Sequence, residues 1–273
     1  MTQLTLAPLS NFDVGAVAAA AVAIAAYRLR ALDASGALAA FVVGGATYGA
    51  LGPRGAAVLL AFFITSVAFS RLGRARKATL LVDVGKTGRR DGTQVFANGG
   101  IAALCALLAL WVDARYAVAF AGAFAAATAD TWGTELGALA REQPRSILSL
   151  RPIATGLSGG VTRAGTLAEI AGALWIALVA ELLQPHAFLA VACGGFAGAL
   201  LDSLLGASLQ LLRWCPNCKR ATEREPHVCG ANTTPLRGLS WVGNDAVNFV
   251  STLGGAASAY ALAFCFLPYF FSR

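Results

Sequence analysis

The chain has 273 residues, of which 57% are hydrophobic and only 13% are charged, with a net charge of +7 and a mean hydropathy of +0.65. A soluble domain carries roughly 25% charged residues, so this composition excludes an ordinary water-soluble fold and predicts an integral membrane protein. The positive charge does not indicate nucleic acid, because no nucleic-acid-binding motif accompanies it. We attribute it to membrane topology and to lipid headgroups or phosphorylated ligands.

Apolar stretches with few or no charges follow one another along the whole chain. Each is close to the length that an α-helix needs to cross ~30 Å of hydrocarbon at ~1.5 Å per residue. They predict an all-α fold, a polytopic bundle of about eight transmembrane helices that forms a single domain over residues 1–273. The predicted spans are 14–27, 34–51, 55–70, 95–112, 117–140, 167–183, 187–212 and 239–267.

Basic residues are divided unequally between the two sides of this predicted bundle. Alternate loops hold 18 of the 21 Lys and Arg residues, and the other side keeps only Arg54, Arg115 and Arg273. Cytoplasmic loops carry the surplus of Lys and Arg in membrane proteins. We therefore expect a multi-pass protein of the cell membrane with both termini outside. A cleaved signal peptide is not predicted, because Asp13 stands where a basic residue would precede the first apolar run.

The loop before the fourth stretch is rich in glycine and positive charge, Val84-Gly-Lys-Thr-Gly-Arg-Arg-Asp-Gly92. Glycine-rich backbone next to Lys and paired Arg is typical of phosphate-binding sites, where the main chain comes close to the phosphate and the side chains supply positive charge. It is not a Walker P-loop, because that pattern would require glycine at Leu80. A loop that merely sets topology is the alternative. The predicted phosphate and nucleotide ligands here are Lys86, Thr87, Gly88, Arg89, Arg90 and, in the next span, Asn98.

Four acids interrupt the later apolar stretches. An ionisable residue within a span costs about 2.5–3.5 kcal/mol on insertion scales, so each acid is a functional hypothesis. Counting residues puts all four about 8 to 15 Å from the cytoplasmic end of their spans. Carboxylate oxygens suit Mg²⁺, although hydrogen bonding between helices is the alternative role. The predicted Mg²⁺ ligands are Asp130, Glu135, Asp202 and Asp245, with Asn244 and Asn248 beside the last of them.

A second Gly-rich loop precedes the sixth stretch, Thr155-Gly-Leu-Ser-Gly-Gly-Val-Thr-Arg-Ala-Gly-Thr166. Its backbone N–H groups are expected to bind a phosphate at the start of that helix. The segment Thr166-Leu-Ala-Glu169 matches a capping box, so we assign Glu169 to helix capping and not to a ligand set. The predicted ligands in this loop are Ser158, Gly159, Gly160 and Thr162.

Soft metal ligands cluster in the loop of residues 213–237, which we expect on the cytoplasmic side. Cys215-Pro-Asn-Cys218 is followed by His227-Val-Cys229, a set that suits tetrahedral Zn²⁺. Full coordination leaves no open position for catalysis, so we predict a structural zinc knuckle. Free thiols or a redox pair are the alternatives, and a disulfide is disfavoured on the reducing side. Cys105, Cys193 and Cys265 lie in apolar stretches and are interpreted as small apolar residues.

Together these segments resemble a membrane protein family that includes the plant chloroplast phytyl-phosphate kinase of vitamin E synthesis, an animal transmembrane homologue, and bacterial and archaeal members. The resemblance covers roughly residues 30–265 and rests on segments 85–100, 129–137, 158–166, 202–203 and 244–248. It implies transfer of a phosphoryl group from a nucleoside triphosphate, CTP in the plant enzyme, to an isoprenyl monophosphate. The Cys/His loop resembles a feature of prokaryotic members, which argues against a role for it in the chemistry.

This interpretation assigns a role to each group of residues. Lys86, Arg89 and Arg90 clamp the nucleotide phosphates, and together with Asp130, Asp202 and Asp245 they form the predicted catalytic set. A lipid monophosphate is already a nucleophile at neutral pH, so no strong general base is needed. Its oxygens are oriented by asparagines and its tail lies between helices, entering from the cytoplasmic leaflet. The oligomeric state is left open, a homodimer included. The asparagines are Asn98, Asn244 and Asn248.

Two other classes of protein use similar groups. A transporter also keeps acids within the membrane, on broken helices of repeated halves, but near the midplane, whereas these acids lean toward one face. A cytidylyltransferase that makes a CDP-lipid would use the same residues and release pyrophosphate. Both remain alternatives to the kinase.

Overall fold

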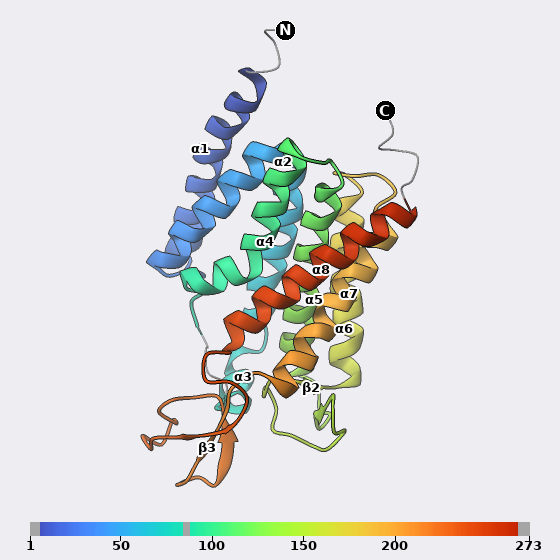
Figure 1. Ribbon diagram of the computed structural model, residues 1–273. Helices are drawn as coiled ribbons and strands as arrows, with labels where there is room; N and C mark the ends of the chain where they lie inside the picture. The colour runs from blue at the N-terminus through green and yellow to red at the C-terminus, as the bar shows by residue number, and fades with distance from the viewer. Residues whose placement is uncertain (1–5, 84–87, 267–273) are drawn as a thin grey trace.

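The computed structural model describes residues 6–83 and 88–266, and over these it is predominantly helical (Figure 1). Five of the helices, α2, α4, α6, α7 and α8, are long and apolar enough to cross a membrane. All the predicted spans fall on helices. The helices are α1 (Leu6–Arg28), α2 (Ala34–Arg71), α3 (Arg74–Leu80), α4 (Gly92–Trp111), α5 (Tyr116–Gly137), α6 (Arg163–Ala180), α7 (Phe188–Ser208) and α8 (Asn244–Phe266).

Helix α2 contains two of the predicted spans and folds back on itself between them. Gly52 adopts φ 61° and ψ −156°, and Pro53 follows it inside the helix. Glycine tolerates this positive φ, and proline lacks the N–H that would continue the helix. A straight helix of this length would measure about 57 Å. Instead, the Arg71 guanidinium at its end donates to the Leu29 carbonyl just before its start, at 2.6 Å.

Two predicted boundaries are wrong in detail at the polar ends of helices. The last span was expected to begin at residue 239, but α8 begins at Asn244 after a turn. The seventh was expected to continue to residue 212, but α7 ends at Ser208 and Leu212 begins a strand. Hydropathy records apolar side chains and not backbone hydrogen bonds. A span predicted from it therefore extends too far where apolar residues continue beyond the end of the helix.

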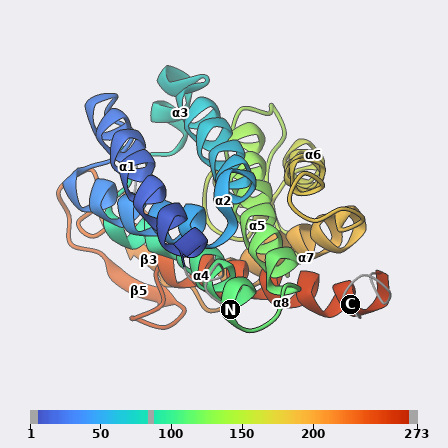
Figure 2. The ribbon, with the colours of Figure 1, turned by 90° about the horizontal axis from the view of Figure 1, so that it is seen from above.

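Helix α5 forms the centre of the bundle. Every residue from Ala117 to Ala129 is buried, and α5 contacts α2, α4, α6, α7 and α8. Seen from above (Figure 2), it lies between α2 on one side and α6 and α7 on the other. Glycines make this packing close: a Cβ on Gly195 would lie 2.5 Å from the Ala125 Cβ, and one on Gly198 would lie 2.5 Å from that of Ala126. Small residues allow helices to pack through backbone contact in this way.

The short strands and α3 gather at one end of the bundle, and the start of α1 and the end of α8 lie toward the other end (Figure 1). The Cys/His segment is a small sheet, which the all-α prediction did not include. It is antiparallel in the order β4-β3-β5. Strands of two to four residues are too short to show a periodic signal. The strands are β1 (Arg145–Ser146), β2 (Gly160–Val161), β3 (Leu212–Cys215), β4 (Arg220–Thr222) and β5 (Thr234–Arg237).

Candidate active site

A polar cavity of about 1100 Å³ lies where the helices meet the loops and strands. It collects predicted site residues from four helices and two loops that are far apart in the sequence. Two predicted ligands, Lys86 and Thr87, lie outside the described residues. The cavity is lined by Gly88, Arg89, Arg90, Asn98, Asp130, Glu135, Ser158, Gly159, Gly160, Thr162, Asp202, Asn244, Asp245 and Asn248.

Two acids from neighbouring helices form the centre of this cavity. Asp130 on α5 and Asp202 on α7 face each other, with Thr134 and Ser251 as hydrogen-bonding neighbours. The Asp202 Oδ2 atom is buried and has no hydrogen-bond partner among the described residues. Two facing carboxylates repel each other unless a proton or a cation lies between them. The pair therefore has the donor chemistry of a divalent cation site.

A third acid joins the cavity from the first turn of α8. The Thr93 hydroxyl on α4 donates to Asp245 Oδ2 at 3.1 Å, which ties the starts of the two helices together. Asn244 begins α8 and Asn248 follows one turn later, buried at 8% exposure. Because helix N-termini carry partial positive charge, the starts of α4 and α8 favour an anion in the cavity beside Arg89 and Arg90.

The fourth predicted ligand, Glu135, has a different environment. Lys77 Nζ lies 2.5 Å from its Oε2, and the Ser70 hydroxyl donates to its Oε1 at 2.6 Å. Lys77 is only 5% exposed and also donates to the Phe69 carbonyl. The sequence did not single out Lys77, because it follows Arg74 and Arg76 in a run that was interpreted as topology-setting. Its charge neutralises Glu135, so the two form an internal ion pair at the cavity wall.

Glu169 is a fifth carboxylate in the cavity, and the capping role predicted for it is wrong. The Gly165 N–H donates to the Thr162 side chain at 2.9 Å, so Thr162 caps α6 and the helix begins at Arg163. Glu169 then lies nearly two turns inside the helix. Its side chain is buried, packs against Gly133 of α5 and lines the cavity. The capping-box pattern, Thr166 to Glu169, therefore lies within α6 and not at its N-terminus.

The second Gly-rich loop packs tightly against its surroundings. The Ser158 N–H donates to Glu223 Oε1 of the Cys/His segment at 2.8 Å, and the Gly160 N–H donates to the Leu157 carbonyl. Gly159 has φ +79°, and a Cβ there would lie 2.4 Å from the Ala207 Cβ of α7. Only glycine fits this close approach. The loop lines the cavity with some of its amides already bonded, and phosphate binding by it stays a prediction.

An apolar pocket of about 190 Å³ lies between α1, α2 and α4. Its walls are mostly alanine, valine, leucine and phenylalanine side chains. Three of its lining residues, Arg90, Gln94 and Asn98, also line the polar cavity. The two spaces therefore meet at the first two turns of α4, with an arginine and an asparagine at the junction. The sequence predicted a lipid tail between helices but not which helices enclose it.

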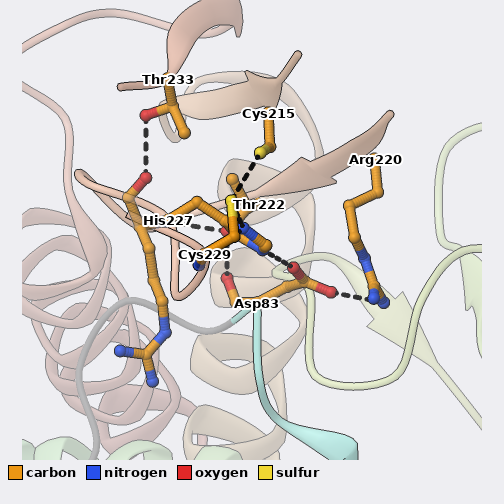
Figure 3. A network of polar contacts seen from close by, with 8 residues as sticks. Asp83, Cys215, Arg220, Thr222, His227, Cys229 and Thr233 are labelled. Carbon is orange, nitrogen blue, oxygen red and sulfur yellow. Dashed lines mark hydrogen bonds and ion pairs between the residues drawn. The ribbon is translucent and has the colours of Figure 1, made fainter. Parts of the chain in front are cut away.

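The four predicted zinc ligands come together at the Cys/His sheet, and Figure 3 shows three of them, Cys215, His227 and Cys229. One ligand atom from each of Cys215, Cys218, His227 and Cys229 lies within 4.8 Å of every other. Hydrogen bonding by His227 lowers the pKa of the Cys229 thiol to about 6. All six cysteines are free thiols. Hydrogen bonding with Cys229 in turn raises the pKa of the Cys218 thiol to about 11, so the four side chains already interact as one cluster.

Fold and site together define a multi-pass helical membrane protein with a carboxylate-lined cavity at one end. The chain belongs to the integral membrane protein DUF92 family, whose model matches residues 17–256. This confirms the family resemblance inferred from the motifs and the multi-pass membrane prediction. Protein PGR of Arabidopsis thaliana is 31% identical over 207 residues, which is 65% of this chain and 70% of that protein.

Two further relatives are uncharacterized membrane proteins. One, from Methanocaldococcus jannaschii, is 40% identical over 120 residues, 43% of this chain and 50% of that protein. The other, from Synechocystis sp., is 28% identical over 188 residues, 65% of this chain and 61% of that protein. The chain thus spans less than two thirds of the length of both. No solved structure gives a significant match.

Proposed function

We propose that this protein is a membrane phosphotransferase that converts an isoprenyl monophosphate into the diphosphate at the expense of a nucleoside triphosphate, with CTP as the first candidate. The observation that carries the proposal is the meeting of two spaces. A polar cavity with six carboxylates adjoins an apolar pocket, and both are lined by Arg90, Gln94 and Asn98. A substrate with a phosphate head and a hydrocarbon tail matches that junction.

Arg90 is the residue best placed to hold the lipid phosphate. Its backbone is fixed on both sides, because its N–H donates to the Ala31 carbonyl and its own carbonyl accepts from Asp33 N–H, each at 3.1 Å. A guanidinium binds phosphate oxygens through two parallel hydrogen bonds. Asn98 lies nearly two turns into α4, the helix that begins just after Arg90. The tail then extends among the apolar side chains of α1 and α2.

The acids supply the other half of the site. We assign Mg²⁺, one or two ions, to Asp130, Asp202 and Asp245, and the buried unpartnered oxygen of Asp202 supports this. Mg²⁺ held by these carboxylates would neutralise the charge of the nucleotide phosphates. Glu135 was predicted in the same set, but its pairing with Lys77 suits it better to shaping the cavity wall.

The reaction needs little proton transfer from the protein. An oxygen of the lipid monophosphate, ionised at neutral pH, forms a bond to the γ-phosphorus, while the bond to the β–γ bridging oxygen breaks. The nucleoside diphosphate leaves with that oxygen and its electron pair. Arg89 and Arg90 offset the charge that develops on the phosphoryl oxygens. Positioning and charge neutralisation are thus the work of the side chains.

We further propose eight crossings of the cell membrane by one domain, with α2 contributing two through its fold at Gly52. The cavity would face the cytoplasm, because its mouth carries the basic residues that mark that side. Residues 213–237 would then lie in the cytoplasm and both termini outside. The basic residues that line the cavity are Arg30, Arg71, Arg74, Lys77, Arg89, Arg90 and Arg224.

The experiment that tests the function uses purified protein in detergent with Mg²⁺, either CTP or ATP, and isoprenyl monophosphates from geranyl to phytyl and longer. Products are resolved by mass spectrometry. The proposal expects an isoprenyl diphosphate together with CDP or ADP. A CDP-lipid with pyrophosphate would instead identify a cytidylyltransferase, and absence of nucleotide turnover would make transport the leading function. The matched control is Asp113→Asn, an acid between α4 and α5, which does not line the cavity.

A further inference from the structure

The Cys/His sheet has the geometry of a closed tetrahedral metal site. Cys215 ends strand β3, and its register partner Arg220 begins β4, so the turn between them brings Cys218 close. The Cys215 and Cys229 sulfurs are 3.6 Å apart, where Zn–S bonds of ~2.3 Å in a tetrahedron give about 3.8 Å. His227 Nδ1 lies 3.1 Å from the Cys229 sulfur. Three thiolates and one imidazole form a set that selects zinc.

The second nitrogen of His227 points away from the cysteines to a buried carboxylate (Figure 3). His227 Nε2 lies 3.1 Å from Asp83 Oδ1, and Asp83 is only 2% exposed. Arg220 binds the other oxygen of Asp83 at 2.7 Å. A metal-bound histidine commonly donates its other N–H to such a carboxylate, which orients the ring. Asp83 therefore completes the metal site from outside the ligand set.

The backbone of Asp83 is bound to β4, the strand that begins with Arg220, and to the residue that follows it. Its carbonyl accepts from the Glu223 N–H at 2.8 Å and from the Thr222 hydroxyl at 3.1 Å. Asp83 lies between α3 and α4, only a few residues before Arg89 and Arg90 of the cavity. The other end of this connection is held by the backbone bonds of Arg90 to Ala31 and Asp33. The Cys/His sheet thus holds Asp83, a few residues before the arginines, and Arg90 itself is held by residues 31–33.

A second contact leads from the sheet to the opposite wall of the cavity. Glu223 Oε1 accepts the N–H of Ser158 at 2.8 Å. Glu223 and the next residue, Arg224, themselves line the cavity. Ser158 belongs to the Gly-rich loop that packs on α7 through Gly159. The end of β4 therefore holds two loops, one on each side of the cavity.

We propose that residues 212–237 form a zinc-dependent clamp, in which the metal fixes the sheet, and the sheet holds Asp83 shortly before Arg89 and, through Glu223, holds the Gly-rich loop. A segment this short cannot build a sufficient apolar core, and such units fold only when the metal binds. Metal occupancy then controls the shape of the cavity without contact between metal and substrate. Zinc binding and loop fixation do not depend on the proposed reaction; only their effect on turnover does.

The first test measures the metal itself. Elemental analysis of the purified full chain should give one zinc per chain, and cobalt in its place should show the visible absorption of a tetrahedral thiolate site. Cys218→Ser should lose the metal, whereas Cys218→His, which keeps a zinc ligand, should retain it. Absence of stoichiometric metal in the unaltered chain would overturn the site.

The second test separates the clamp from a merely local fold. Hydrogen exchange at residues 88–91 and 156–160 should accelerate in the chelated protein and in Asp83→Ala, while the core of α5 stays protected. Asp83→Ala should also weaken zinc binding by about 10- to 100-fold, the effect of losing an outer partner, and Asp83→Glu should restore part of both. The control is Glu225→Gln, because Glu225 pairs with Arg213 of β3 and is not among the residues that line the cavity.

The exchange and metal measurements decide the clamp, and the kinase assay decides the reaction. Zinc-loaded Asp83→Ala with unchanged exchange in both loops would overturn the clamp. If the kinase assay also works, Asp83→Ala should raise the KM for nucleotide or lipid more than it lowers kcat, since its role is to position binding residues. If no kinase activity exists, the exchange and metal results still decide the clamp, so the two proposals fail separately.

Discussion

Asp130 and Glu135 lie on the same helix and line the same cavity, yet their surroundings are opposite. Glu135 is paired with Lys77 and accepts from Ser70. Asp130 faces a second carboxylate, Asp202, and no cation of the described residues forms an ion pair with it. An acid with its own counter-ion is already neutralised. An acid that faces another acid has the surroundings of the proposed Mg²⁺ ligand, so partners, and not depth or residue type, distinguish the two acids.

The sharpest way to break this comparison is to remove one of the facing acids. Asp130→Asn and Asp202→Asn should each lower kcat on the order of 10³-fold, because each removes a charged ligand of the metal that stabilises the transferring phosphoryl group. Thermal stability in detergent should be unchanged or slightly raised, since one repulsive carboxylate is gone. Full kcat in either variant, with Asp113→Asn as reference, would refute the metal assignment.

The paired acid should show the opposite behaviour. Glu135→Gln or Lys77→Met leaves a largely buried charge without its partner, and such a change destabilises by about 3–5 kcal/mol. The double variant should recover most of that loss. Melting temperatures of the two single variants and the double variant measure the coupling. If the single changes leave stability intact and abolish turnover instead, Glu135 belongs with the metal ligands after all.

A smaller effect is expected at the junction of the two spaces. Arg90→Lys keeps the charge but loses two-pronged phosphate binding, and should raise the KM for the lipid monophosphate about tenfold with a lesser change in kcat. Arg141→Gln, an exposed arginine outside both spaces, is the control. Steady-state kinetics over a range of lipid concentrations make the measurement. An unaltered lipid KM would remove Arg90 from the phosphate site.

The smallest effect should come from the apolar pocket. Ala40 lines it, and Ala40→Leu should shorten the usable space and shift the ratio of kcat/KM toward geranyl over phytyl phosphate by several-fold, up to about tenfold. Leu38→Phe, on the same helix but 67% exposed, adds bulk outside the pocket and should not change the ratio. Equal ratios in both variants would place the tail elsewhere.

The helices and the gathering of the acids could be predicted from the sequence, because both rest on local patterns. Long apolar runs predict helices directly, and counting along each run gave Asp130, Asp202 and Asp245 a common depth. The resemblance then grouped the same residues. Boundaries were less certain where apolar residues continue past a helix, as at Leu212, because the pattern records burial and not hydrogen bonding.

What could not be predicted are the contacts between distant segments. Lys77 looks like any basic loop residue until the fold brings it to Glu135, and Asp83 carries no signal of its bond to His227. Glu169 shows the reverse problem, because a valid local pattern was overridden by an earlier cap at Thr162. Such pairings depend on the packing of whole helices, so a single sequence holds no local trace of them.

The glycine contacts at the back of the cavity limit how substrates can come and go. Gly195, Gly198 and Gly255 press against alanines of α5 with almost no side chain between the helices, and α5 is buried throughout this stretch. A molecule could cross to the other side of the bundle here only if α5 separated from α7 and α8. Under the proposed function, nucleotide would therefore arrive and depart through one mouth, and a lipid held at the junction with α4 would return to the leaflet from which it came.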